Sequence, residues 1–124
     1  METIQAVDKL AALAQETRLR IFRLLVEQGP EGLKAGAISE SLALPPATLS
    51  FHVAHLARTG LVTSRQEGRF IFYAASFAAM DDLIAYLTDN CCQGKVCLPK
   101  TSAVATTPKR RARIPGPSSP QGKT

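Results

Sequence analysis

The three cysteines of this 124-residue chain lie together in one short segment. Cys91, Cys92 and Cys97 read C-C-x4-C, and the sequence holds no other cysteine. A disulfide between adjacent cysteines is strained, so a structural bridge within the pair is unfavourable. Thiolates are soft ligands that select thiophilic metals and metalloids. The cluster therefore predicts a soft-ion site or a redox switch.

The number of sulfur ligands narrows the choice of ion. A structural zinc site takes four ligands, and the sequence offers no evident fourth one. Three thiols suit a three-coordinate pyramidal centre, such as trivalent arsenic or antimony, whose lone pair fills the remaining position. Cadmium, lead, zinc and oxidants stay open as alternatives at the same cysteines. A free thiol has a pKa near 8.5, so ion binding must expel protons and should strengthen as pH rises.

Five helical segments and one hairpin are expected in residues 1–98 and must position this cluster. The first helix carries an apolar stripe at helical spacing, formed by Ile4, Val7, Leu10, Ala11, Leu13 and Ala14. A second helix spans 16–28 and ends at Gly29-Pro30. We expect its buried side to comprise Leu19, Phe22, Leu25 and Val26.

The middle of the chain predicts a helix-turn-helix followed by a wing. A short helix at 35–42 and a longer one at 46–59 flank a break that contains two prolines. Residues 61–66 and 69–74 are rich in β-forming residues and flank a Glu67-Gly68 turn. Ser76 then caps a last helix with an apolar stripe of Phe77, Met80, Leu83, Ile84 and Leu87. The expected fold is mainly α, a winged helix-turn-helix of about five helices with a two-stranded wing.

The second helix of the pair has a surface suited to a DNA groove. Its core side is Leu49, Val53 and Leu56, and the rest is mostly small and uncharged. Hydroxyls near the N-terminus can meet base edges, a phenyl ring can meet thymine methyl groups, and arginines can meet phosphates. The predicted DNA contacts are Thr48, Ser50, Phe51, His55 and Arg58 on the helix, with Arg65 and Arg69 in the wing.

Most of these predicted contacts have a simpler alternative. Thr48 and Ser50 could cap the helix, and Phe51 could pack against a neighbouring segment. We expect His52 to be buried and hydrogen-bonded rather than a ligand. The two wing arginines could be ordinary surface charges.

The net charge of +5 is concentrated at the C-terminus. From Pro99 onward there are six basic residues and no acidic one, which leaves residues 1–98 near neutral. Residues 99–124 also hold five of the eight prolines and lack apolar periodicity, so they predict a disordered basic tail. Its KRRAR run is either a solvated charge cluster or a weak, salt-sensitive contact to DNA.

Several classes of protein are excluded. No apolar run approaches the roughly 20 residues that a membrane span needs. The first ten residues do not resemble an export signal, and the odd cysteine count favours reduced thiols in a cytoplasm. An enzyme such as a thiol-based arsenate reductase would need a C-x5-R loop. In such a loop the arginine stands six residues after the cysteine. The residues six after Cys91 and Cys92 are Cys97 and Leu98, so the arginine is missing and we expect no catalytic site.

In combination these motifs resemble the ArsR/SmtB family of winged-helix metalloregulatory repressors. The likeness rests on residues 33–38 (LKAGAI), 45–52 (PPATLSFH), 60–62 (GLV), 67–69 (EGR) and 90–92 (NCC). The resemblance implies a homodimer joined through its first and last helices. It implies an apo form that binds double-stranded operator DNA without a cofactor and releases it when a metal binds.

One feature departs from many arsenic-sensing members, which carry a cysteine pair in the first helix of the helix-turn-helix. Residues 33–42 contain no cysteine. The resemblance is therefore to a subset with C-terminal cysteines, which implies Cys91, Cys92 and Cys97 as ligands of an As(III) or Sb(III) inducer. Some of that subset uses only the vicinal pair and prefers methylated arsenic, and Cys97 favours the inorganic ion.

Overall fold

A computed structural model describes residues 1–94 of the chain. Met1–Asp89 form one compact unit, and a second unit begins at Asn90. Of the second unit, the described part is a short 3-10 turn, η1, at Cys91–Gly94. The predicted tail at 99–124 lies outside the described residues. No helix in the described part is long and apolar enough to cross a membrane.

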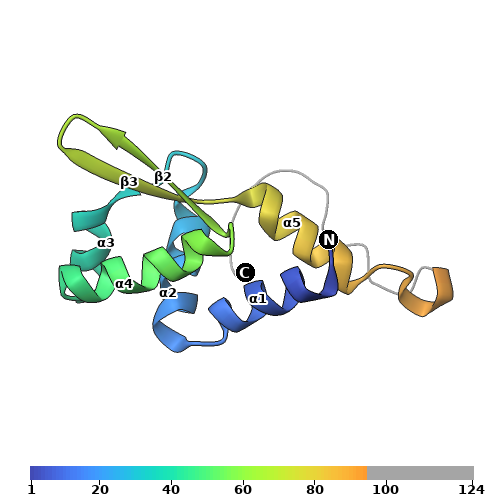
Figure 1. The fold of residues 1–124 in the computed structure, drawn as a ribbon. Coiled ribbons are helices and arrows are strands. Elements are labelled where there is room, and N and C mark those ends of the chain that lie inside the picture. Colours follow the sequence, from blue (N-terminus) through green and yellow to red (C-terminus); the bar gives the residue numbers. More distant parts are fainter. Residues whose placement is uncertain (95–124) are drawn as a thin grey trace. The chain divides into compact units, whose positions relative to one another are not determined.

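Five α-helices form within residues 1–94, as predicted (Figure 1). They are α1 (Thr3–Leu13), α2 (Glu16–Gln28), α3 (Ala35–Leu42), α4 (Pro46–Arg58) and α5 (Phe77–Leu87). The Gln15 side chain caps α2 by accepting from the Arg18 N–H, and Ser76 caps α5 by accepting from the Ala79 N–H. These caps satisfy N–H groups that a helix leaves without partners in its first turn.

The wing belongs to a three-stranded antiparallel sheet, not the expected two-stranded one. The strands are β1 (Leu33–Lys34), β2 (Val62–Glu67) and β3 (Phe70–Ala75), in the order β1-β3-β2. β1 was missed because two residues carry no alternation signal. Both hairpin strands begin one residue later than predicted: Glu67 pairs with Phe70, so the turn is Gly68-Arg69. Gly68 takes the positive φ of +63° that such a tight turn needs.

A single apolar core holds Met1–Asp89 together. Its fully buried side chains include Ile21 and Leu25 of α2, Ile38 of α3, and Leu56 and Leu61 at and after the end of α4. The expectation for α2 was wrong at Leu19, which is 44% exposed, whereas Ile21 is buried. Six apolar residues in this helix permit more than one buried face, and packing against α4 and β3 selects Ile21, Phe22 and Leu25.

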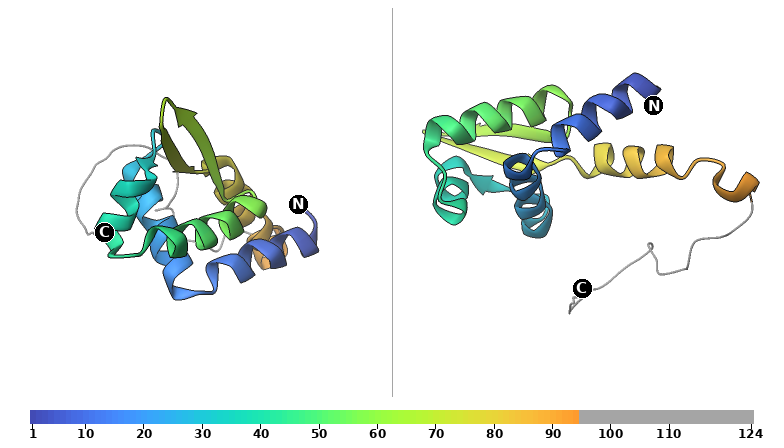
Figure 2. Two further views of the ribbon diagram at one scale, coloured as in Figure 1. Left: turned by 60° about the vertical axis from the view of Figure 1, so that its left-hand side comes forward. Right: turned by 90° about the horizontal axis from the view of Figure 1, so that it is seen from below.

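The hairpin and the helix-turn-helix lie at one end of this unit. In Figures 1 and 2 the β2–β3 turn projects to the same side as α3 and the N-terminus of α4. The arrangement brings segments that are distant in sequence to one surface, as the winged-helix prediction requires.

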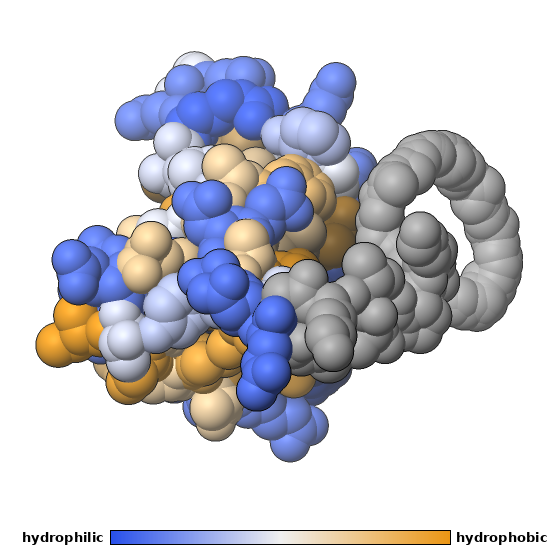
Figure 3. All heavy atoms as spheres, turned by 90° about the vertical axis from the view of Figure 1, so that its right-hand side faces the viewer, coloured by the Kyte–Doolittle hydropathy of each residue, from blue (hydrophilic) through white to orange (hydrophobic). Residues whose placement is uncertain are grey.

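The other end of the unit carries an apolar surface that no described residue covers. The stripe of α1 stays exposed at Ile4, Val7 and Leu10, and so do Ile84 and Leu87 of α5. Figure 3 looks onto this end and shows apolar (orange) side chains exposed among polar (blue) ones. The hydroxyls of Thr3 and Tyr86 touch and join α1 to α5 within the subunit. We call Ile4, Val7, Leu10, Ile84 and Leu87 the α1–α5 face.

Candidate nucleic-acid interface

α4 is fixed to the core along one side only. Leu49, Val53 and Leu56 are at most 2% exposed, as the sequence predicted. Pro45 is the N-cap and Pro46 the first helical residue, a position where proline costs no hydrogen bond. The opposite side of α4 is therefore free to contact another molecule over its whole length.

The outward side carries the predicted groove-contacting residues together. Ser50, Phe51 and Arg58 are exposed, and Thr48 and His55 are half-buried beside them. Phe51 is 67% exposed, more than any other phenylalanine in the described residues. Thr48, Phe51, His55 and Arg58 follow each other at spacings of three and four residues, so they form one stripe.

The simpler alternatives for three of these residues are wrong. No described side chain caps the N-terminus of α4 by a hydrogen bond, so Thr48 and Ser50 do not act as caps. Phe51 does not pack into a neighbouring segment, and its ring meets that of His52 edge-on, at 5.3 Å between centroids. Ser50 and Phe51 are exposed and Thr48 is partly so, which leaves these side chains available for a groove.

His52 matches its expectation in hydrogen bonding but is only half-buried. Its Nδ1 lies 3.3 Å from a terminal nitrogen of Arg18 on α2. Burial and the positive charge of Arg18 lower the pKa of His52 below its ordinary 6.5. Partial desolvation, then Arg18, Arg58 and His52, lower the pKa of His55 as well. The lowered pKa of each histidine favours its neutral form.

The two wing arginines differ in what holds them. The Arg65 guanidinium donates to Glu67 Oε2 at 2.6 Å and to the Glu31 carbonyl at 2.9 Å, and stacks over Phe72 at 4.6 Å. It thus fastens the wing to the loop before β1. Arg69 is exposed at the turn and makes no hydrogen bond or ion pair within the described residues. Of the two, Arg69 is the one free to reach a phosphate.

Lys34 is a basic residue at this edge that sequence reasoning missed. It ends β1, and its ammonium lies 4.3 Å from the centre of the Phe70 ring. A hollow of about 310 Å³ beside it is lined by α3 and the wing, including Arg69. The third strand brings Lys34 there through its pairing with Phe72, and that short strand left no signal in the sequence.

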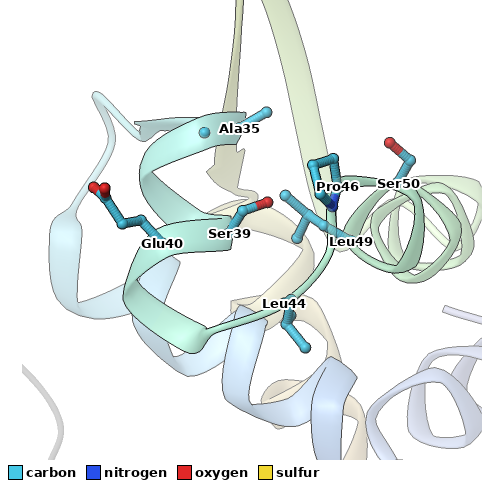
Figure 4. A pocket seen from close by; sticks show the side chains of 8 residues that line it. Ala35, Ser39, Glu40, Leu44, Pro46, Leu49 and Ser50 are labelled. Carbon is cyan, nitrogen blue, oxygen red and sulfur yellow. The ribbon is translucent and has the colours of Figure 1, made fainter.

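A second hollow separates the two helices of the helix-turn-helix (Figure 4). Its volume is about 390 Å³, and it is lined by Ala35, Gly36, Ser39, Glu40, Leu44, Pro46, Leu49 and Ser50. In Figure 4 the Ser39 hydroxyl points toward α4, while Glu40 points away from it. Apolar atoms dominate the lining, and only Glu40 carries a charge. The hollow is the gap between two packed helices and lacks the converging polar groups of a small-molecule site.

The predicted metalloid ligands lie in the second unit. Cys91 is half-buried and opens η1, followed by Cys92. Asn90 and Gln93 take positive φ angles of 57° and 59°, so the chain turns sharply on both sides of the pair. Cys97 lies outside the described residues, so the three-cysteine site stays a prediction. Among the side chains that the structure describes, no three of His, Cys, Asp or Glu are grouped to hold a metal.

Comparison with known proteins now identifies the family. Residues 13–65 match a family model described as a helix-turn-helix domain. The transcriptional activator HlyU of Vibrio cholerae is 37% identical over 89 residues, which cover 72% of this chain and 80% of HlyU. The structure of V. cholerae HlyU has a TM-score of 0.59 and covers 75% of this chain and 100% of that one.

Two further structures carry the family name. An ArsR-like transcriptional regulator from Rhodococcus sp. RHA1 has a TM-score of 0.62 at 26% identity, covering 73% of this chain and 83% of that one. The homodimeric winged helix-turn-helix domain Mb0332 from Mycobacterium bovis, a possible ArsR-family regulator, has a TM-score of 0.55 at 26% identity, covering 77% and 88%. This chain belongs to the ArsR/SmtB family.

Membership in the ArsR/SmtB family makes the protein a transcriptional regulator with a winged helix-turn-helix. Within this family fold, α4 and the wing hold the exposed stripe, Ser50 and Arg69 at one end of the unit, and the α1–α5 face lies at the other. Family membership thus shows the class of regulator, whereas the individual DNA contacts remain predictions.

Proposed function

We propose that the protein is an arsenic(III)- or antimony(III)-responsive transcriptional repressor. Its apo homodimer binds a palindromic operator in the cytoplasm, and the metalloid releases it. In each subunit α4 enters the major groove with Thr48, Ser50 and Phe51 toward the bases, while His55, Arg58 and the wing arginines lie near the backbone. No cofactor takes part in DNA binding.

The support for DNA recognition is the large exposed apolar side chain of Phe51 beside small hydroxyl residues. The ring lies on the same outward side of α4 as the exposed Ser50, where it could meet thymine methyl groups. Residues 46–75, which include α4 and the wing, carry three arginines and one glutamate, although residues 1–98 are near neutral overall. That local excess of positive charge suits a phosphate backbone.

The observation that carries metalloid sensing is the clustering of every cysteine directly after α5. The donor set fits trivalent arsenic, because three soft thiolates match its preference for three sulfur ligands. Cys91, Cys92 and Cys97 would hold it. Their place in the chain follows the helix whose outer face, at Ile84 and Leu87, we assign to the subunit interface.

The energy needed for such a switch is large but reachable. For near-complete release, the metalloid must bind the DNA-free form of the protein more tightly than the DNA-bound form by roughly 5.5 kcal/mol. The coupling must also be reciprocal, so operator DNA must weaken metalloid binding by the same factor. Relatives of this fold include both the activator HlyU and the repressor BigR from Xylella fastidiosa, so the direction of regulation needs its own measurement.

The deciding experiment is a fluorescence anisotropy titration with arsenite. The protein is bound to a labelled duplex that the wild-type protein has selected from a random pool. We expect arsenite to release the wild-type protein, and a variant with Cys91, Cys92 and Cys97 all changed to serine to bind DNA normally and not respond. X-ray absorption should then report three sulfur neighbours per arsenic, and a promoter–reporter fusion should rise on arsenite addition.

Release of the triple-serine variant by arsenite, or no release of the wild type, would overturn the sensing proposal. The C97S variant separates inorganic from methylated arsenic as the inducer. If Cys97 is a ligand of the inorganic ion, this variant should no longer respond to arsenite but should still respond to a methylated trivalent arsenical. The duplex selection itself tests DNA binding independently of the cysteines.

A second candidate is oxidant sensing by the same cysteines. One solved structure of V. cholerae HlyU, 36% identical to this chain, is described as the reduced form. Peroxide-driven release in the absence of metalloid, reversed by a thiol reductant, would favour this function over the first.

A further inference from the structure

Arg18 joins three segments through one half-buried side chain. Its backbone N–H donates to Gln15 Oε1 at 2.8 Å, which fixes the start of α2. Its Nε–H donates to the Ala12 carbonyl of α1 at 2.7 Å. A terminal guanidinium nitrogen lies 3.3 Å from His52 Nδ1 on α4. One residue therefore contacts the helix of the α1–α5 face and the helix that we assign to the DNA groove.

The contact with α1 is a strong one. Ala12 lies in the last turn of α1, where carbonyl groups have no partner within the helix. A cation there also meets the negative end of the helix dipole, and charge-assisted hydrogen bonds are roughly twice as strong as neutral ones. Ala12 is fully buried, so little water competes for its carbonyl. The guanidinium is thus held on the end of α1.

The contact with α4 specifies the state of His52. Arginine has donors only, so His52 Nδ1 must accept, which leaves the ring neutral with its proton on Nε2. The lowered pKa of His52 agrees with this assignment. Arg18 faces His52 from α2, and His55 is its titratable neighbour on α4. The His52 ring in turn meets the exposed Phe51 ring edge-on, at an angle of 70°.

A continuous path therefore runs from the end of α1 through Arg18 and His52 to Phe51. We propose that Arg18 is a positioning residue for DNA recognition, which ties the orientation of α4 to that of α1. This inference rests on the proposed function, since it assumes that α4 reads DNA. A change in how two subunits pack through α1 would reach the groove-contacting side of α4 by this path.

The test compares operator selectivity in matched variants. Selectivity is the affinity for the selected duplex divided by the affinity for a random-sequence duplex, both measured by anisotropy. Arg18→Met removes both side-chain bonds and keeps the bulk. Arg20→Met is the control, because Arg20 lies exposed on α2 and makes no hydrogen bond or ion pair within residues 1–94. It removes the same charge and leaves the path intact.

His52 variants give a second arm that does not depend on Arg18. His52→Asn keeps an acceptor oxygen near the place of Nδ1, and His52→Leu removes it. We expect Arg18→Met and His52→Leu each to lower selectivity about tenfold relative to Arg20→Met, and their combination to lower it no further. His52→Asn should restore selectivity to near the wild-type value. Circular dichroism and sedimentation confirm that each variant is folded and has the wild-type oligomeric state.

The outcomes separate this inference from the proposed function. Equal selectivity in Arg18→Met and Arg20→Met, multiplicative losses in the double variant, or a His52→Asn protein as impaired as His52→Leu would each overturn the positioning role alone. A wild-type protein that selects no duplex from the pool would overturn the proposed function, and the positioning role with it. A stabilising role without positioning would lower the melting temperature and leave selectivity unchanged.

Discussion

His52 and His55 lie on or beside the side of α4 that we assign to the DNA groove, and the fold favours the neutral form of both. Their pKa values are lowered in the folded protein relative to the ordinary 6.5, which an unfolded chain recovers. The unfolded state therefore binds more protons as pH falls below about 6.5. Their contribution to stability is fully present above that pH and is lost as pH falls toward the folded pKa values.

We predict that the melting temperature of the protein falls as pH drops from about 7 to 5, before most carboxylates titrate. The His52→Asn variant should show a smaller fall, because it keeps an acceptor for Arg18 and cannot take up a proton. Differential scanning calorimetry over this range measures the effect. An identical pH profile for the variant and the wild type would contradict the prediction.

The residues of α4 show how much of a site can be predicted from residue type and spacing. The helical wheel correctly separated Leu49, Val53 and Leu56 from the outward residues, because a one-sided apolar pattern permits only one buried face. Arg18 was not found, because a charged residue among apolar ones in α2 gives no sign of its partner. The role of Arg18 depends on its contacts with the Ala12 carbonyl and with His52, which lie in other helices.

At the scale of elements, helices were predicted well and the sheet less well. The bounds of α2 and α3 follow from local signals: Gly29-Pro30 after the one, and the Ala43–Pro45 break after the other. The hairpin was placed one residue early, because Glu67-Gly68 and Gly68-Arg69 are both plausible turns. Strand β1 was missed, since its two residues are held by pairing with β3 and by the close approach of Gly32 rather than by their own pattern.

Gly32 is the element-scale feature that lets β1 reach the wing. It has a φ of +77°, and a Cβ built on it would lie 2.2 Å from the Tyr73 carbonyl oxygen of β3. We predict that Gly32→Ala destabilises the fold by about 3 kcal/mol, through backbone strain and displacement of β1. Chemical denaturation measures the loss.

The matched control is Gly68→Ala in the same sheet. Gly68 also has a positive φ, +63°, but a Cβ there meets nothing within 4 Å. This variant should lose only about 1–2 kcal/mol, the cost of the backbone conformation alone. Equal losses in the two variants would show that the contact with Tyr73 does not limit this position.

At the scale of the whole molecule, the proposed pairing of subunits through the α1–α5 face would decide whether two α4 helices can bind one operator together. Ile4, Val7 and Ile84 are each more than half exposed, and Leu87 is 57% exposed. A patch of this kind on a monomer is a liability, whereas a second copy of the chain would bury it. A symmetric dimer formed there could set two α4 helices about 34 Å apart, over successive major grooves.

We predict that Val7→Asp makes the protein monomeric, because the change places an unpaired carboxylate in the centre of an apolar interface twice per dimer. The dimer dissociation constant should rise roughly a hundredfold or more. Analytical ultracentrifugation measures it directly. Operator affinity should fall with it, because a monomer engages one half-site and loses the effective concentration that links two.

Leu19→Asp serves as the matched control for that variant. Leu19 is also a large exposed apolar residue, 44% exposed, but it lies on α2 outside the α1–α5 face. The Leu19→Asp variant should remain dimeric and bind the operator as the wild type does. If Val7→Asp instead sediments as a dimer and keeps its operator affinity, the subunits pair through another surface, and the path from α1 through Arg18 to α4 no longer connects the interface with the groove.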